Sequence, residues 1–252
     1  MYCPFGHDPI LGDDVMHDWR ESYLDRFSAA RSEGEVFQHL AAAVSELGFE
    51  YCSYGIRAPL PMSNPRFSLH SDYPEAWADR YVSCNYFAMD PTVRHGMTQS
   101  VPLIWQANLQ AQDNEFWEEA SHYGLRHGWC MPTKGNAGTI GLVTMVRSSE
   151  RVTEQELAEK EYRMSWLVSA ANGTMSQHLV KKMVPESTVE LTARERETLR
   201  WSAVGKTYLE IAQILSVDGR TVKFHLVNAM RKLNATNKTE AAVKASVLGL
   251  LF

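Results

Sequence analysis

The feature that most constrains the fold is a series of helix-start signals in residues 188–252. In each signal a Thr or Asn that can cap a helix stands three residues before a glutamate: Thr192 with Glu195, Thr207 with Glu210, and Asn237 with Glu240. Asp218 can begin a further helix that runs to about Leu233. Residues 188–252 are therefore predicted to form a small all-α domain of four helices with short connections.

Two of these helices have the spacing of a DNA-binding motif. The helices expected over 207–215 and 218–233 are separated by the short turn Ser216-Val217, as in a helix-turn-helix. On the second helix, apolar residues that recur with the helical period are expected to be buried: Val222, Leu226, Ala229, Met230 and Leu233. The exposed face then holds Arg220, Lys223, Phe224, Val227, Asn228 and Arg231.

Two interpretations of that mixed face remain open at this point. Basic residues beside apolar ones suit a major groove, where Lys contacts guanine, apolar groups contact thymine methyl groups and Arg contacts phosphate. Residues 186–252 hold 10 Lys and Arg against 7 Asp and Glu, a net charge of +3, whereas the whole chain carries −5. The alternative is a plain helical bundle with a charged face.

The preceding residues predict a mixed α and β domain over 16–180. Residues 1–15, rich in Gly, Pro and Asp, are expected to form an irregular leader, and residues 181–187 a linker. Helical spacing between Trp19 and Leu47 predicts two helices, and 75–82 and 116–123 predict two short ones. Segments 49–56, 67–70, 128–132 and 139–146 favour strands, whose short connections favour antiparallel pairing.

A long helix closes this domain, beginning with the capping pattern of Thr153 and Glu156. Its apolar residues form one stripe from Leu157 to Leu179. Either this helix only covers the sheet, or it also meets a second subunit.

The composition limits the cellular compartments and the kinds of site that are expected for this chain. With 44% hydrophobic residues, the chain is neither disordered nor collagen-like. The four cysteines are more than thirty residues apart, which favours reduced, buried thiols over a zinc site or a disulfide framework. Neither a membrane-spanning run nor a signal peptide is found, so we expect a cytoplasmic protein with no membrane partner, no metal and no cofactor.

Aromatic residues around one aspartate suggest a ligand site. On a helix that starts near Pro74, Trp77 and Tyr81 share a face, and Asp90 precedes Pro91 in an extended conformation. A buried carboxylate beside Trp and Tyr donors suits a small polar head group with an apolar tail. The alternatives are an aromatic core and an aspartate that only caps a turn.

A phosphorylated receiver domain is an alternative regulator of DNA binding by the helix-turn-helix. A receiver would begin with a strand that leads into an acidic pair. Asp13-Asp14 lies in the Gly- and Pro-rich leader with no strand before it, so a ligand-binding domain is the favoured interpretation.

Several motifs of residues 188–252 resemble the DNA-binding domain of the LuxR/FixJ class of transcription regulators. They are 191–199 (LTARERETL), Gly205-Lys206-Thr207, Glu210-Ile211-Ala212, 220–225 (RTVKFH) and Arg231-Lys232-Leu233. The resemblance implies a four-helix helix-turn-helix domain in which Lys223, Phe224 and Val227 face bases. The remaining implied DNA-binding residues are Arg220, Arg231, Lys206 and Thr207. Some members of the class carry Arg at the position of Val227. Any base contact that such an Arg makes is therefore not implied for this chain.

The stretch 72–91, with Trp105, 124–128 and Pro132, resembles the autoinducer-binding domain of LuxR-type acyl-homoserine-lactone receptors. Residues 16–252 as a whole resemble this family, most closely its QscR-like orphan receptors. The resemblance implies an α+β chain, with an N-terminal α/β/α sandwich around an antiparallel sheet.

The resemblance to the autoinducer-binding domain also implies how the ligand is bound. Trp77 would donate to the lactone carbonyl, and Asp90 would accept the ligand amide N–H. Tyr73, with Ser53 nearby, would bind the acyl carbonyl. The walls around the lactone would be formed by Tyr81, Trp105 and Trp117.

The implied protein is a quorum-sensing regulator that binds an N-acyl-homoserine lactone and, as a homodimer, palindromic double-stranded DNA. RNA polymerase is a further implied partner. An enzyme that hydrolyses the same lactones would need an activated nucleophile or a metal cluster, and the histidines include no H-x-H or H-x-x-x-H pair beside Asp. The third hypothesis is a regulator that binds another apolar signal, or none. The presence of both Trp77 and Asp90 argues against it.

Overall fold

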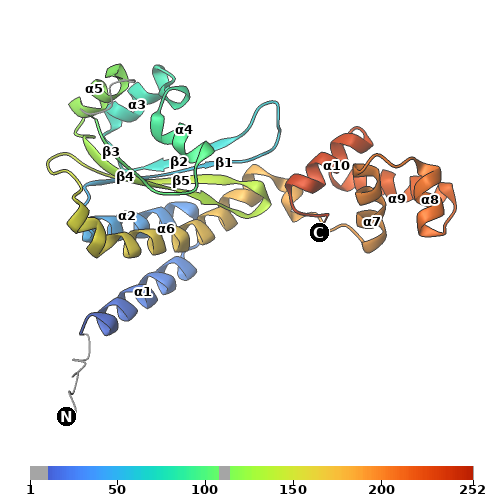
Figure 1. Ribbon diagram of the computed structural model, residues 1–252, viewed down its shortest axis with the longest axis horizontal. Coiled ribbons are helices and arrows are strands. Elements are labelled where there is room, and N and C mark those ends of the chain that lie inside the picture. Colours follow the sequence, from blue (N-terminus) through green and yellow to red (C-terminus); the bar gives the residue numbers. More distant parts are fainter. Residues whose placement is uncertain (1–10, 108–113, 252) are drawn as a thin grey trace, which may run out of the picture.

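A computed structural model describes residues 11–107 and 114–251, which form two domains (Figure 1). The N-terminal domain is a layered sandwich of helices and a sheet. The C-terminal domain is helical and follows the end of the longest helix, with α10 nearest to the sandwich (Figure 1). The two-domain organisation expected from the sequence is therefore present.

Within the described residues, the sheet has five strands in the order β2-β1-β5-β4-β3. They are β1 (Tyr51–Arg57), β2 (Phe67–Ser71), β3 (Leu103–Gln106), β4 (His127–Lys134) and β5 (Ile140–Arg147). Every neighbouring pair is antiparallel, as the short connections predicted. Alternate side chains of each strand point to opposite faces, so the sheet presents one face to each helical layer.

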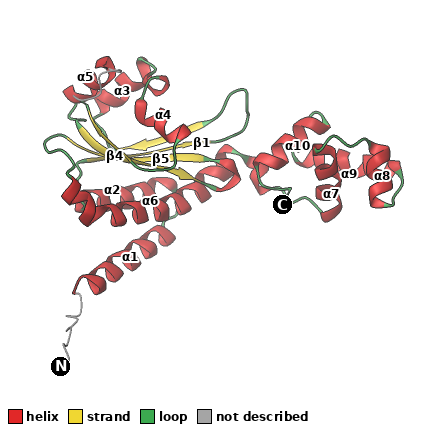
Figure 2. Ribbon diagram, viewed as in Figure 1, coloured by secondary structure: helices red, strands yellow, loops and turns green. Residues whose placement is uncertain are grey.

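Helices cover both faces of this sheet, which confirms the predicted α/β/α sandwich (Figure 2). One layer consists of α2 (Glu33–Glu46) and α6 (Glu154–Met183), on whose outer side α1 (Leu11–Ala29) packs. The other layer holds α3 (Glu75–Ser83), η1 (Tyr86–Ala88), α4 (Pro91–Thr98) and α5 (Asn114–His122). The turn between β4 and β5 contains η2 (Asn136–Gly138).

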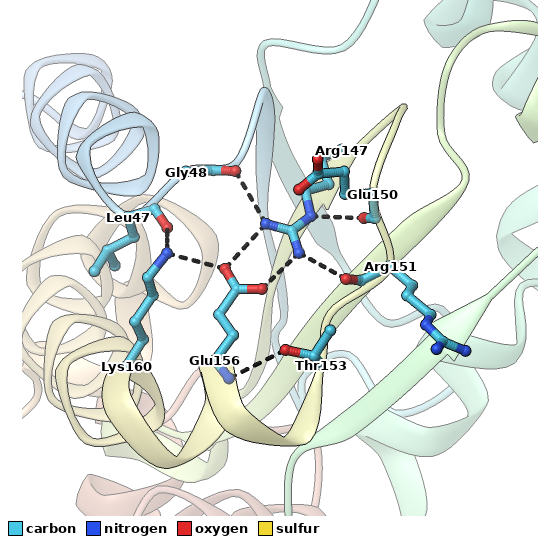
Figure 3. Close-up of polar contacts among 8 residues, drawn as sticks. All are labelled: Leu47, Gly48, Arg147, Glu150, Arg151, Thr153, Glu156 and Lys160. Atoms are coloured by element: carbon cyan, nitrogen blue, oxygen red, sulfur yellow. Dashed lines mark hydrogen bonds and ion pairs between the residues drawn. The ribbon is translucent and has the colours of Figure 1, made fainter.

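One arginine fixes the long helix α6 to the sheet. Arg147 ends β5, and its guanidinium donates hydrogen bonds of 3.0 and 2.6 Å to the Glu156 carboxylate in the first turn of α6 (Figure 3). Lys160, one turn further along, donates to Glu156 and to the carbonyl oxygen of Leu47, both at 2.9 Å. The network therefore joins the ends of α2, β5 and α6.

This network corrects the predicted cap of α6. The Thr153 hydroxyl accepts a hydrogen bond from the Glu156 backbone N–H, as expected of an N-cap. The Glu156 carboxylate does not return the bond to Thr153, because it is bound by Arg147 and Lys160. Hydrogen bonding from Arg147 is the main cause that lowers the pKa of Glu156 to about 2.

Two predicted boundaries are wrong. Residues 11–15 of the expected leader are helical, because α1 begins at Leu11, and residues 1–10 lie outside the described part. Acidic residues are favoured in the first turn of a helix, whereas the sequence-based prediction treated the aspartates of this segment only as turn formers. The expected linker 181–187 begins too early, because α6 continues to Met183. Lys181 and Lys182 lie in its last turn, where basic residues interact favourably with the helix dipole.

One short α-helix and one short strand were not predicted from the sequence. They are α4, which holds only eight residues and includes Gly96, and β3, which holds four. Such segments are too short for a periodic pattern to stand out. Among the described residues, no helix is long and apolar enough to cross a membrane.

The C-terminal domain confirms the four predicted helices. After the short η3 (Pro185–Thr188) come α7 (Ala193–Ala203), α8 (Tyr208–Leu215), α9 (Gly219–Lys232) and α10 (Lys238–Val247). Thr192 with Glu195, and Thr207 with Glu210, form reciprocal capping boxes. Val222, Leu226, Ala229 and Leu233 are buried and Met230 is half-buried, so the predicted inner face of α9 is correct.

Candidate functional site

A largely apolar cavity of about 200 Å³ lies between the sheet and the helices α3 and α4. Strands β1, β2 and β5 form one wall, and α3, η1 and α4 form the other. Its polar lining includes four residues singled out from the sequence: Ser53, Tyr73, Tyr81 and Asp90. Trp77, which is 2% exposed, also lines it.

Asp90 is the buried acid of this cavity. One carboxylate oxygen, Oδ1, accepts hydrogen bonds from the backbone N–H and the hydroxyl of Thr92, both at 2.7 Å. The other oxygen, Oδ2, accepts the Tyr81 hydroxyl at 2.9 Å. Burial is the largest influence on this group and raises the pKa of Asp90 above its ordinary value. The aspartate is thus both the N-cap of α4 and part of the cavity wall.

The carboxylate still has acceptor capacity for a ligand. An ionised carboxylate has about four acceptor sites. Thr92 donates twice to Oδ1 and Tyr81 donates once to Oδ2, while the backbone N–H of Val93 also interacts with the group. A ligand N–H or O–H that reaches Oδ2 would form a strong hydrogen bond, because its acceptor is charged and its surroundings are apolar.

A second hydroxyl pair lies on the strand side of the same cavity. Tyr73, between β2 and α3, donates a hydrogen bond of 3.0 Å to the hydroxyl of Ser53 on β1. Burial is the main cause that holds the pKa of Tyr73 well above its ordinary value, so the phenol stays a donor. Both residues were singled out from the sequence, and the structure brings them together.

A smaller aromatic cavity of about 40 Å³ continues beyond Trp77 and Asp90. Trp105 on β3 and Trp117 on α5 line it, with ring centroids 4.7 Å apart. Their buried indole N–H groups have no acceptor among the described residues. Trp77 and Tyr81 stand edge to face at 5.8 Å, as their spacing on one helix predicted. All seven residues of the predicted ligand site therefore line one of these two adjoining cavities.

Sequence reasoning missed several residues of the site. Thr92 binds Asp90, and Phe116 packs against Trp117. Gly128 lies opposite Trp105 in the sheet, where a β-carbon would overlap the indole ring. The Asp-Pro-Thr order at 90–92 is an N-cap signal that could have revealed Thr92, whereas Gly128 needs the strand pairing to be known.

The structure also locates the groups considered for catalysis. No three His, Cys, Asp or Glu side chains of residues 11–107 and 114–251 lie together in a way that could hold a metal ion. His122 is exposed and His127 half-buried. Cys52 and Cys130 are buried and Cys84 is half-buried, while Cys3 lies outside the described residues.

The second candidate surface is the outer face of α9. Arg220, Lys223, Phe224, Val227 and Arg231 are all exposed there, Phe224 by 62% and Val227 by 51%. Asp218 caps the helix with a hydrogen bond of 2.6 Å from the Arg220 N–H. Apolar side chains this exposed contribute no core packing, so the face is available to a partner.

Lys206 and Thr207 lie at the start of α8 and bind the same carboxylate. The ammonium of Lys206 is 3.2 Å from Glu210, and the Thr207 hydroxyl donates to Glu210 at 2.8 Å. Both residues are beside the backbone N–H groups of a helix N-terminus, a place where phosphate binds well.

Two family models match the chain. The model described as "Autoinducer binding domain" matches residues 32–175, and the one described as "Bacterial regulatory proteins, luxR family" matches residues 189–245. The two matches cover the two domains of the structure.

Individual proteins match over nearly their whole length. The chain is 40% identical to the transcriptional activator protein AnoR of Acinetobacter nosocomialis, over 94% of this chain and 100% of that protein. A crystal structure of Escherichia coli SdiA superposes with a TM-score of 0.82 at 32% identity, over 94% of this chain and 99% of that one. A structure of SdiA in complex with octanoyl-rac-glycerol gives a TM-score of 0.80 at 31% identity, over 98% of both chains.

Proposed function

Because this chain belongs to the luxR family of quorum-sensing transcription regulators, which are not enzymes, we propose that its signal is an N-acyl-homoserine lactone. We further propose that it binds palindromic DNA as a homodimer in the cytoplasm, where it meets its operator and RNA polymerase. The family establishes a small-molecule signal and a DNA-binding domain. The identity of the signal and the assembly are our proposals.

The observation that carries the lactone proposal is the buried Asp90 carboxylate in an apolar cavity. Such an acid can accept a further hydrogen bond from a ligand, and an amide N–H supplies one. The Tyr73 and Ser53 hydroxyls lie on the same cavity and can bind the acyl carbonyl. Trp77 borders both cavities and can donate to the lactone carbonyl. The aromatic walls beyond it, Tyr81, Trp105 and Trp117, suit a compact ring.

The DNA proposal rests on the exposed face of α9. Lys223, Phe224 and Val227 would face base edges, while Arg220 and Arg231 would contact phosphates. We assign Lys206 and Thr207 to phosphate contacts at the start of α8. One such helix reads one half-site, so a palindrome requires two subunits.

The helix layer of the N-terminal domain offers a surface for the second subunit. Tyr162 on α6 is 62% exposed and Leu24 on α1 is 46% exposed. Arg20 packs over the ring of Trp166 between these two helices. We propose that this outer side of α1 and α6 meets its counterpart in the homodimer.

An acylglycerol is a second candidate signal. The related SdiA has been solved with octanoyl-rac-glycerol. A glycerol hydroxyl could also donate to Asp90, although the aromatic cavity would then hold no lactone ring.

Identification of the bound molecule tests this proposal. The protein is produced with a mixture of acyl-homoserine lactones and acylglycerols, then extracted, and the extract is analysed by mass spectrometry. We expect a lactone in amounts near one per chain, and much less from the matched Asp90→Asn protein. Recovery of acylglycerols alone, or of neither class, would overturn the lactone assignment.

A further inference from the structure

The turn between β4 and β5 contacts the C-terminal domain. Gly138, the last residue of η2, lies against Val247, the last residue of α10. A β-carbon at Gly138 would be 2.8 Å from the carbonyl oxygen of Val247 and 3.3 Å from its Cγ1 atom. Figure 1 shows α10 as the helix of the C-terminal domain that lies nearest to the sandwich. The two domains therefore meet at the end of α10, in addition to their covalent connection between α6 and α7.

Glycine suits this contact for two reasons. Gly138 has a φ of +70°, in the left-handed region that favours glycine, and the absence of a side chain leaves room for the carbonyl group of Val247. Gly249 has the same φ, but no neighbouring atom lies within 4 Å of the position of its β-carbon. The backbone conformation alone accounts for Gly249, whereas Gly138 also allows the close approach of another domain.

Residues 58–60 form the other side of this contact. Pro59 Cγ lies 3.4 Å from the β-carbon position of Gly138. Leu60 is only 5% exposed, although it lies in the connection between two strands, and it belongs to a hydrophobic cluster that extends into the C-terminal domain. We call residues 58–60 and 136–138 the docking seat of α10.

Helix α10 is in turn bound to the helix that carries the DNA-binding face. Lys244, in the last turn of α10, donates hydrogen bonds to the carbonyl oxygens of Leu233 at 3.3 Å and Asn234 at 2.6 Å, at the C-terminal end of α9. The orientation of α9 relative to the N-terminal domain therefore follows that of α10. The outer face of α9 remains open in this arrangement, since Phe224 is 62% exposed.

The docking seat adjoins the large cavity. Arg57 and Ile140 are paired at the ends of β1 and β5, and both line the cavity. Residues 58–60 of the seat follow Arg57 directly, and Ile140 comes two residues after Gly138. A molecule that contacts these two cavity residues would restrict the strand ends that hold the seat. A seat that is already ordered loses less conformational entropy when α10 docks on it.

We propose that docking of α10 on this seat orients the DNA-binding face of α9, and that a molecule in the large cavity strengthens the docking. The inference rests on the proposed function for the nature of the signal and for the palindromic operator. Because the docked arrangement leaves α9 open, the contact assists DNA binding. Domains that are already oriented lose less freedom when two subunits bind one palindrome.

Substitutions at two neighbouring positions of α10 test the docking. Val247 is half-buried against the seat, whereas Ser246 is exposed. Val247→Lys places an ammonium group against the seat, and Ser246→Lys, the matched control, adds the same charge to the same helical turn. Val247→Ala removes contact atoms without adding a charge and covers the case that the lysine variant does not fold.

Hydrogen exchange of the full-length proteins, without DNA or ligand, measures the docking itself. We expect faster exchange of the amides of residues 135–139 in Val247→Lys than in Ser246→Lys, and a smaller increase in Val247→Ala. A mixture of acyl-homoserine lactones should slow this exchange in wild type and in the control, and should slow it less in Val247→Lys.

Affinity for an operator, selected from random DNA by the wild-type protein with these lactones, measures the consequence. With the lactones present, Val247→Lys should bind the operator roughly five- to tenfold more weakly than Ser246→Lys, at the low end of common couplings between distant sites. The added charge is equal in the two variants, so it cannot cause the difference.

The outcomes separate this inference from the proposed function. Equal exchange of residues 135–139 in Val247→Lys and Ser246→Lys, or an operator affinity of Val247→Lys that equals or exceeds that of the control, would overturn the docking. If lactones bind to wild type without slowing this exchange, the coupling to the cavity is wrong and the lactone function stands. If no lactone binds to wild type, the proposed signal is wrong, and the exchange without ligand still decides the docking.

Discussion

The hydroxyl of Tyr81 donates a 2.9 Å hydrogen bond to the carboxylate of Asp90, which also caps helix α4. One aspartate therefore orders the start of a helix and presents an oxygen to the cavity. Tyr81 holds Oδ2 while Thr92 holds Oδ1, so the carboxylate has a fixed orientation before any ligand enters. A preorganised acceptor lowers the entropy cost of ligand binding.

Asp90→Asn should weaken the ligand response by roughly tenfold to a hundredfold, because an amide N–H would then face the N–H of the ligand. Asparagine is also a good N-cap, so α4 should remain folded. Transcriptional dose-response curves at equal amounts of folded protein measure the effect. An unchanged midpoint would show that Asp90 does not bind the signal.

Glu156→Gln should reduce the free energy of unfolding by about 2 kcal/mol at neutral pH, because Arg147 loses its charged partner. The folded-state pKa of Glu156 is lowered to about 2, so its contribution is complete above the unfolded value of 4.5 and is lost as pH falls towards 2.

Urea unfolding of wild type and variant at several pH values checks this prediction. The difference between them should be largest near neutrality and shrink as the pH decreases below 4.5. Glu154→Gln, an exposed change in the same helical turn, is the control. A difference that does not depend on pH would contradict the assigned ion pair.

Lys223→Ala and Arg231→Ala should have different effects on DNA binding. Lys223 lies near the start of α9, where it can reach a base, so its loss should cost roughly 1–3 kcal/mol and relax the preference at one base pair. Arg231, two turns later, should reach only phosphate, so its loss should weaken all sequences alike and reduce the salt slope by about one.

Binding to singly substituted operators at two salt concentrations separates these cases. In the same assay, Val227→Arg should tighten binding only to operators with guanine at that position. If Lys223→Ala weakened every operator equally, the orientation assigned to α9 would be wrong.

The fragment 186–252 should fold alone but bind the operator poorly. It contains its own core around Leu199, Ile211 and Val222, each with 0% exposure. A single module contacts one half-site, whereas two linked modules gain from effective concentration. Circular dichroism and an operator titration measure the two properties. Equal affinity of the fragment and the full-length protein would argue against dimerisation through the N-terminal domain.

Elements with a periodic pattern or a local signal could be predicted from the sequence. The capping residues Thr192 and Thr207 gave the C-terminal helices correctly, because a cap depends on only four consecutive residues. Trp77 and Tyr81 were placed on one helical face for the same reason.

Features that depend on distant residues could not be predicted. Glu156 looked like the partner of Thr153, but Arg147 from the preceding strand binds its carboxylate. The close approach of Gly128 to Trp105 becomes visible only when the pairing of β3 with β4 is known. A single sequence contains no direct record of that pairing.

The most direct test of this account is the NMR spectrum of an acyl-homoserine lactone with a nitrogen-15-labelled amide, bound to the full-length protein. If Asp90 accepts the ligand N–H in this cavity, the amide proton should shift downfield and exchange slowly with water, because hydrogen bonds to carboxylates are strong. The shift should be lost in the Asp90→Asn protein. An amide proton that keeps its free-solution shift and exchange rate in the bound state would contradict the account.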